Sequence, residues 1–268
     1  MRAAIVTAPG TIEIADLPVP VPGPGEALVE VTAAAINPVD RFTARSGIAR
    51  GLGWDFAGTL ADGTAVTGVA VGFGDLGSHA EYVVAQTRFL TPTDIEPLAA
   101  ATLSLNALAA ARTLELATGT SILVTGAAGS VGAYIVELAA RQGRAVIAQA
   151  DDADAAFLRA IGAAEVLGRG QTYPQRVDTV IDAAVIGSLD RVRDGGTYVN
   201  MLPNAVPATE RGIDVVTVDE SGYPDNLAEL IAAPLTARVA QTYPLEEIEK
   251  AYRHADQAGL RGRIVLVP

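Results

Sequence analysis

The sequence predicts an α/β protein in which a doubly wound parallel sheet is joined to a β-rich domain. The first hundred residues contain short β-prone runs separated by proline- and glycine-rich turns. Near residue 96 the pattern changes, and apolar strands then alternate with helical stretches, as in parallel βαβ units. Half of the residues (50%) are apolar, which is enough for a substantial core in each part.

The β-rich part is read from alternating short runs and their breakers. Strands are expected at residues 3–7, 27–31, 56–60, 65–71 and 80–84. The segment LPVPVPGPGE between the first two is expected to be an extended loop, because its prolines and glycines oppose regular structure.

The alternating part begins with an Ala/Leu-rich helix expected over Pro97–Leu116. After it, strands are expected at residues 121–124, 145–148, 179–181, 198–201 and 214–218, with helices at 130–142 and 154–161. Two helices at 226–232 and 245–256 and a strand at 263–267 complete the prediction.

The segment SILVTGAAGSVG (121–132) is the most informative. An apolar strand runs into a glycine turn and then a helix, the context that dinucleotide binding requires. Gly126 and Gly129 would let the main chain approach a pyrophosphate, and Gly132 would let the helix pack closely on the strand. The helix N-terminus then offers N–H groups to the phosphates. The alternative is a glycine turn that only packs.

Composition excludes several classes of site. Cysteine is absent and there are two histidines, so disulfides, thiolate zinc sites, a cysteine nucleophile and a multi-histidine metal site are excluded, and no metal is expected. A net charge of −12 disfavours nucleic acid as a partner. No apolar run reaches the roughly 18 to 20 residues that cross a bilayer, and the first residues lack a signal-peptide pattern. A cytoplasmic location without membrane contact is expected.

Eight segments in register resemble the zinc-independent medium-chain dehydrogenases/reductases of the quinone oxidoreductase (zeta-crystallin-like) family. They are PVPVPGPGEALVEV, INPVDRF, GWDFAG, GSHAEYVV, GAAGSVG, IGAAEVL, DGGTYV and YPLEEIEKAYRHADQAGLRGRIVL. Together they span almost the whole chain, and the absence of cysteine agrees with the zinc-free branch.

The resemblance implies a Rossmann dinucleotide-binding domain at residues 98–221 and a GroES-like substrate domain formed by residues 1–97 and 222–268. It implies an NAD(P)H-dependent enzyme that transfers hydride to a small-molecule quinone or α,β-unsaturated carbonyl, and a homodimer. Two rivals stay open: a biosynthetic tailoring enzyme for a bulky polycyclic or carrier-bound substrate, with or without net redox change, and a non-catalytic, crystallin-like binding protein.

The resemblance also assigns substrate-side residues. Asn37 and Asp40 of the NPVD motif are the catalytic candidates; Asn37 would contact the nicotinamide or the substrate carbonyl, or else form an Asx turn before Pro38. The alternative for Asp40 is to cap a helix that begins after it. The substrate candidates are Trp54, Phe73 and Asn106, and the two aromatic residues fit a core role equally well. His79 is expected to be a surface or core histidine, with a catalytic acid as the alternative, and His254 is expected to be structural.

The cofactor-binding candidates are Gly126, Ala127, Ala128, Gly129, Ser130, Val131, Gly132, Asp151, Asp152, Arg169, Met201 and Leu202. Asp151 and Asp152 follow the second parallel strand, where a carboxylate accepts the ribose hydroxyls of NADH and repels the 2′-phosphate of NADPH. Arg169 would offset that charge by pairing with the phosphate. The family implies NADPH and the local charge favours NADH; NADPH is placed first, with NADH close behind.

The chain departs from the family pattern at several places. The segments 46–53 and 58–66 are shorter than in relatives, which predicts a wider or differently lined substrate cleft. Ala109 replaces a threonine that usually meets the nicotinamide ribose, with Asn106 as a new polar group nearby. Residues 168–177 form a short connection that trims a helix of the nucleotide domain.

Overall fold

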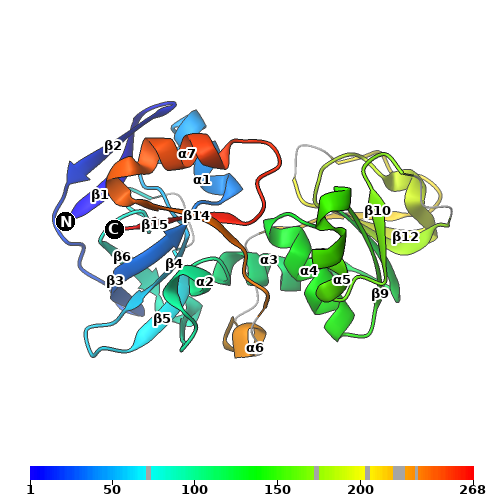
Figure 1. Cartoon of the computed structure of the whole chain (residues 1–268), viewed down its shortest axis with the longest axis horizontal. Coiled ribbons are helices and arrows are strands. Elements are labelled where there is room, and N and C mark those ends of the chain that lie inside the picture. The colour runs from blue at the N-terminus through cyan, green and yellow to red at the C-terminus, as the bar shows by residue number, and fades with distance from the viewer. Residues whose placement is uncertain (71–73, 172–174, 203–205, 220–226, 233–234) are drawn as a thin grey trace. The chain divides into compact units, whose positions relative to one another are not determined.

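The computed structural model describes residues 1–70, 74–171, 175–202, 206–219, 227–232 and 235–268. The described residues form two compact units (Figure 1). Met1–Leu105 and Asp225–Pro268 contribute to the first unit, and Asn106–Pro224 contribute to the second. The ends of the chain thus share one unit, and the middle of the chain forms the other.

The first unit is built on a largely antiparallel sheet. Its described strand order is β14-β15-β3-β4-β5-β7, with β6 paired to β3, and a separate hairpin joins β1 to β2. The strands are β1 (Arg2–Ala8), β2 (Thr11–Asp16), β3 (Glu26–Ala35), β4 (Asp55–Thr59), β5 (Ala65–Val69), β6 (Tyr82–Gln86), β7 (Leu90–Pro92), β14 (Val239–Pro244) and β15 (Arg263–Val267). The C-terminal β15 pairs with both β14 and β3, which places the tail of the chain within the N-terminal sheet.

The helices of the first unit are α1 (Pro38–Ser46), α2 (Pro97–Ala100), α6 (Leu227–Ala232) and α7 (Ile248–Ala255). The helix α1 begins at proline, whose fixed φ suits the first helical position, and ends at Gly47 in the left-handed conformation. One core cluster joins the hairpin, α1 and α7, through residues such as Ile12, Ala44 and Ala251. Apolar faces of elements far apart in the sequence therefore close this unit.

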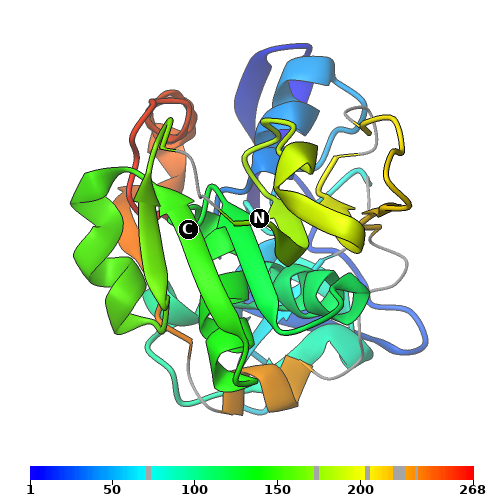
Figure 2. The ribbon, with the colours of Figure 1, turned by 90° about the vertical axis from the view of Figure 1, so that its right-hand side faces the viewer.

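The second unit is a parallel sheet of order β10-β9-β8-β11-β12-β13, seen in green to yellow in Figure 2. Its strands are β8 (Ser121–Thr125), β9 (Ala145–Ala150), β10 (Glu165–Gly168), β11 (Val177–Asp182), β12 (Val192–Asn200) and β13 (Asp214–Thr217). The helices α4 (Ser130–Arg141) and α5 (Ala155–Ala160) cover one face of it (Figures 1 and 2). The predicted fold class, a doubly wound parallel sheet with a separate β-rich unit, is confirmed.

Two local expectations were wrong. The helix expected over 97–116 is broken into α2 and α3 (Ser104–Leu116). At the break, the Thr102 hydroxyl donates to the Ala99 carbonyl (2.8 Å), and the Asp55 carboxylate accepts the Leu105 N–H (3.2 Å). The strands β2, β7, β10 and β14 were not expected, and each forms by pairing with a partner strand.

Candidate functional site

The glycine turn lies between β8 and α4. Gly126 has φ +59, and a Cβ there would come within 3.2 Å of the Ala184 nitrogen. A Cβ on Gly132 would lie 2.3 Å from the Gly126 carbonyl oxygen. Glycine is therefore required at both positions, for backbone conformation at the first and for close helix packing at the second.

The turn leaves the start of α4 uncapped by any side chain. Gly129 is the N-cap, is solvent-exposed and has φ −74 and ψ 175. The first turn of a helix has no intrahelical acceptors, so the N–H groups of Ser130, Val131 and Gly132 are available at the positive end of the helix dipole. This cradle fits the diphosphate of a dinucleotide.

Two other predicted residues of the turn lie differently. Ala127 is fully buried, and its N–H is donated to the Gln149 carbonyl (3.1 Å), which ties the turn to β9. Ala128 is half-buried. Of the predicted set, Ala127 thus faces the interior of the unit.

Asp151 follows the last residue of β9 and caps a short 3-10 turn. Its Oδ1 accepts the Ala153 N–H at 3.0 Å, so the carboxylate is held beside the end of the strand. The Asp152 carboxylate lies against Gly168, where a Cβ would meet its Oδ1 at 2.6 Å. Arg169 is exposed at the turn that follows β10. The structure thus places two acidic residues directly after β9, one of them against the end of the neighbouring β10, and Arg169 directly after β10.

Met201 and Leu202 follow β12, at the same carboxyl edge of the sheet. The Thr113 hydroxyl on α3 contacts the Met201 sulfur at 3.6 Å, and the Asn200 side-chain amide donates to the Leu202 carbonyl. Leu202 is 47% exposed. Both lie at the carboxyl edge of the parallel sheet, where ligands bind in such folds.

In the first unit, Asn37 and Asp40 lie at the start of α1. Asn37 is the N-cap, and the Asp40 carboxylate accepts the Asn37 N–H at 2.6 Å. The other oxygen of Asp40 accepts the Gly53 N–H at 3.1 Å. Asp40 is therefore inside the helix, at its third position, and does not cap a helix that begins after it. Because both its oxygens are engaged, it joins the start of α1 to the segment before β4.

A second buried carboxylate, Asp55, and the guanidinium of Arg263 lie in the same region. Burial raises the pKa of both Asp40 and Asp55 to about 7, against the opposing effect of the Arg263 charge. Arg263 also donates to the Ile36 carbonyl at 2.7 Å. Sequence reasoning missed Asp55 and Arg263, because nothing in a single sequence marks a carboxylate as buried.

His79 is a core histidine. Its Nε2 lies 3.4 Å from the Ala35 carbonyl oxygen, which can only accept, so its Nδ1 accepts from the Tyr252 hydroxyl at 3.1 Å. Burial lowers the pKa of His79 to about 4, so the ring is neutral at pH 7. His254 pairs with the Tyr243 hydroxyl at 2.9 Å.

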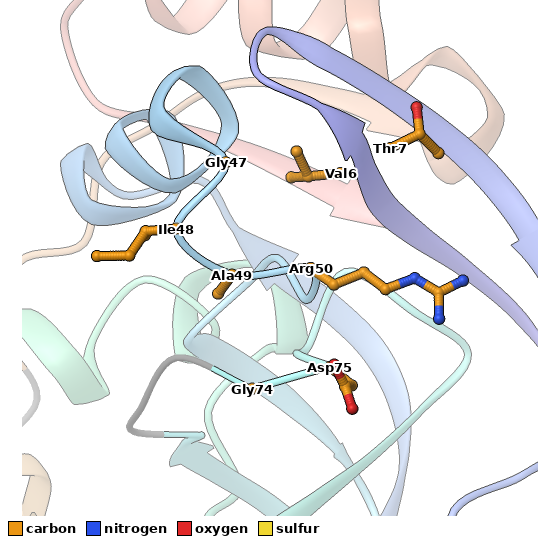
Figure 3. A pocket seen from close by; sticks show the side chains of 8 residues that line it. All are labelled: Val6, Thr7, Gly47, Ile48, Ala49, Arg50, Gly74 and Asp75. Atoms are coloured by element: carbon orange, nitrogen blue, oxygen red, sulfur yellow. The ribbon is translucent and has the colours of Figure 1, made fainter.

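The three substrate candidates predicted from the sequence were Trp54, Phe73 and Asn106. Trp54 (4% exposed) and Asn106 (1%) are buried, and Phe73 lies outside the described residues. A pocket of about 720 Å³ in the first unit is lined by Ile48, Arg50 and Asp75, among others (Figure 3). Among the described residues that line it, none belongs to the predicted site.

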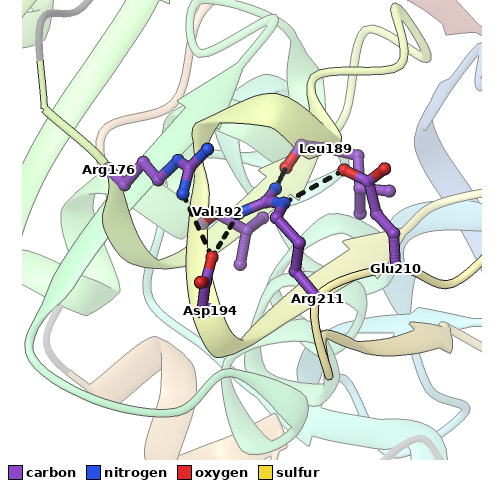
Figure 4. A network of polar contacts seen from close by, with 6 residues as sticks. All are labelled: Arg176, Leu189, Val192, Asp194, Glu210 and Arg211. Atoms are coloured by element: carbon purple, nitrogen blue, oxygen red, sulfur yellow. Dashed lines mark hydrogen bonds and ion pairs between the residues drawn. The ribbon is translucent and has the colours of Figure 1, made fainter.

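A surface network in the second unit involves other residues. Asp194 accepts from Arg176 (3.0 Å) and Arg211 (2.9 Å), and Arg211 also donates to the carbonyls of Leu189 and Val192 (Figure 4). Because Arg176 directly precedes β11, this network lies at the amino edge of the sheet, opposite the glycine turn. Its contacts hold together the chain segments around the start of β12.

The chain has sequence relatives among proteins named as dehydrogenases and reductases. No protein-family model matches the chain. A zinc-type alcohol dehydrogenase-like protein of Schizosaccharomyces pombe is 30% identical over 190 residues, which cover 64% of this chain and 58% of that protein. Prostaglandin reductase-3 of Bos taurus is 28% identical over 84% of this chain and 64% of its own length. The chain thus spans less than two thirds of these two relatives.

Solved structures match the whole fold. A quinone oxidoreductase from Coxiella burnetii has a TM-score of 0.86 at 24% identity, covering 100% of this chain and 99% of the other. The quinone oxidoreductase of Thermus thermophilus, solved also with NADPH, has a TM-score of 0.86 at 22% identity, covering 100% of both chains. These relatives and folds are consistent with the resemblance to the medium-chain dehydrogenases/reductases. They agree with the resemblance carried by the eight sequence segments.

Within the described ranges, no helix is both long enough and apolar enough to span a bilayer.

Proposed function

We propose that the chain is a medium-chain dehydrogenase/reductase, a zinc-independent NAD(P)H-dependent reductase of quinones or α,β-unsaturated carbonyl compounds. One observation carries the proposal: the glycine turn after β8 leads into a helix whose N-terminus has no side-chain cap. The turn follows β8, whose neighbour on one side in the sheet is β11. The strand order reverses between these two strands, and dinucleotides bind at such a point in parallel sheets.

The residues present have assignable roles toward the cofactor. The N–H groups of the first turn of α4 would hold the diphosphate, and Asp151 would accept the hydroxyls of the adenosine ribose. A bound nicotinamide supplies hydride chemistry that no protein side chain provides. Met201 and Leu202, at the carboxyl edge, would contact the cofactor further along. Arg169 would pair with a 2′-phosphate if NADPH is the cofactor.

On the substrate side, Asn37 is the polar group proposed to hydrogen-bond the substrate oxygen. Asp40 would keep Asn37 in place through the Asn37 N–H. For an enone, hydride adds to the β-carbon, the electron pair of the C=C bond moves to the carbonyl oxygen, and a proton from water completes the saturated product. Trp54 and Asn106 remain proposed substrate-side residues, although both are buried.

The absence of zinc from the proposal rests on the chain's own donors. The chain has no cysteine thiolate, and each of its two imidazoles is hydrogen-bonded to a tyrosine hydroxyl, so the thiolate and multi-histidine donor sets that zinc prefers are absent. A homodimer belongs to the same proposal and is tested by sedimentation velocity.

The test is a reductase assay on the purified chain. NADH and NADPH are each mixed with a set of quinones, enones and, as controls, saturated ketones, and loss of the reduced nicotinamide absorbance is followed. Turnover of quinones or enones but not of saturated ketones supports the proposal. Binding of a cofactor with no turnover of any acceptor favours a non-catalytic member of the fold. Absence of cofactor binding overturns the proposal.

A further inference from the structure

A second buried carboxylate cluster, not anticipated from the sequence, lies in the parallel sheet. Asp182 is the last residue of β11 and is fully buried. Its Oδ1 accepts from the Thr125 hydroxyl (2.5 Å) and the Ile186 N–H (3.2 Å). Its Oδ2 accepts from the Gly187 N–H (2.8 Å) and from the Tyr198 hydroxyl. Four donors from β8, β12 and the following loop thus converge on one side chain.

The four donors hold this carboxylate in a fixed position. Burial and the Asp182 carboxylate raise the pKa of Tyr198, so the phenol remains a neutral donor. The Thr125 hydroxyl donates to Asp182 and accepts the Ala184 N–H at 3.0 Å. Through direct and relayed contacts, Asp182 therefore restrains the N–H groups of three residues in the five-residue loop 183–187.

That loop has a strained backbone. Val185 has φ 55, in the left-handed region, which is unfavourable for a β-branched residue. Gly187 also has a positive φ, of 78, at no steric cost. Strain of this kind persists only where surrounding contacts impose it, and the bonds from Ile186 and Gly187 to Asp182 directly follow the strained residue.

The position of the loop indicates its use. The turn after β8 and the loop after β11 flank the point where the strand order reverses. They are in contact range, because a Cβ on Gly126 would lie 3.2 Å from the Ala184 nitrogen. Asp151, the group proposed for the adenosine ribose, lies on the other side of β8, after β9. With the diphosphate at the β8 turn, the second half of a dinucleotide extends over β11.

We propose that Asp182 is a positioning residue, which holds the strained loop 183–187 in the shape that receives the nicotinamide half of the cofactor. The inference rests on the proposed function, because it assumes a dinucleotide at the glycine turn. Val185 and the exposed Ile186 give the loop an apolar surface, suited to a planar ring. Asp182 acts on the cofactor only through this backbone.

The experiment compares two ligands that share the adenosine and diphosphate groups. NADH carries the nicotinamide and ADP-ribose does not, and the dissociation constant of each is measured by calorimetric titration. In Asp182→Asn, the side-chain NH₂ group replaces an oxygen that accepts hydrogen bonds, and it faces groups that also donate. We expect the affinity for NADH to fall at least about tenfold and the affinity for ADP-ribose to stay nearly unchanged. Val185→Gly, which relieves the strain, should weaken NADH binding selectively without lowering the unfolding temperature.

The matched control is Asp178→Asn. Asp178 lies on the same strand and accepts the N–H groups of Thr120 (2.8 Å) and Ser121 (2.9 Å), but at the amino edge of the sheet. It should leave both affinities unchanged. Should Asp182→Asn fail to fold, Tyr198→Phe removes one donor and tests the same selective loss.

Each outcome decides between the two claims. The positioning role is overturned if the folded Asp182 or Tyr198 variant loses affinity equally for both ligands, or loses affinity for neither. The reductase proposal stays in place in that case. Wild-type affinities that are equal for NADH and ADP-ribose overturn it as well. Wild-type protein that binds neither ligand overturns the proposed function, and the positioning role with it.

Discussion

Replacing Gly129 by alanine distinguishes two interpretations of the glycine turn: that it binds a diphosphate, or that it only packs. The backbone at Gly129, with φ −74 and ψ 175, is one that any residue adopts. An added Cβ meets only the Gly126 carbonyl oxygen, at 3.1 Å, so a shift of a few tenths of an ångström relieves the contact. We expect the free energy of unfolding to change by less than about 1 kcal/mol.

The effect on binding should be larger. The methyl group would stand at the exposed entrance to the N–H groups of α4, where the diphosphate must approach. A loss of about 1.4 kcal/mol or more, at least about tenfold in affinity, is expected for both NADH and ADP-ribose, because both carry the diphosphate. Calorimetric titration gives the affinities and denaturant unfolding gives the stability.

Substitutions at two other glycines serve as comparisons for the Gly129 variant. Gly132→Ala places a Cβ 2.3 Å from the Gly126 oxygen, and should cost about 1–3 kcal/mol of stability. Gly143→Ala, at φ +75 with open space around it, should cost about 1–2 kcal/mol and leave binding intact. If Gly129→Ala binds both ligands as wild type does, the bare amides of the turn do not hold a diphosphate.

Three further predictions concern charge and burial. Asp151→Ser should shift the ratio of NADPH to NADH affinities at least about tenfold toward NADPH, because a carboxylate that repels the 2′-phosphate is gone; an unchanged ratio places that phosphate elsewhere. Burial raises the pKa of Asp55 to about 7, whereas an unfolded aspartate titrates near about 3.9, so the folded state holds a proton that the unfolded chain has released. Between those values, rising pH destabilises the fold, and Asp55→Asn should gain stability relative to wild type by up to about 1.4 kcal/mol per pH unit from about pH 5 to 7. Denaturant titrations across that range check this, and a difference independent of pH contradicts it. Tyr252→Phe removes the donor to the buried His79 Nδ1 and should cost about 1–3 kcal/mol, measured by unfolding of both proteins at pH 7; full stability in the variant would mean that water replaces the hydroxyl.

The sequence predicts the parallel sheet well where structure is locally encoded. The strand expected at 121–124 is β8, and the helix expected at 130–142 is α4, each within one residue at its ends. An apolar β-prone run followed by glycines specifies strand, turn and helix from within about a dozen residues. The same locality made the glycine turn the strongest prediction for a cofactor site.

Prediction was weaker where a residue's role depends on distant partners. Nothing in the residues around Asp55 indicates that it lies beside Arg263, which is more than two hundred residues away along the chain. The break between α2 and α3 has the same origin, because a carboxylate on β4 accepts the N–H group at the start of α3. Propensity alone favours one continuous helix there.

Local sequence patterns were sufficient to predict the two-part α/β organisation and the glycine turn with its following helix. These depend on hydrophobic period and on backbone freedom, which are properties of neighbouring residues. Three features required the folded structure: which carboxylates are buried, that Asp40 lies within α1, and that Asp182 accepts from four donors next to a strained loop. Desolvation and convergent hydrogen bonds depend on the positions of side chains from separate strands, and those positions exist only after the sheets have formed.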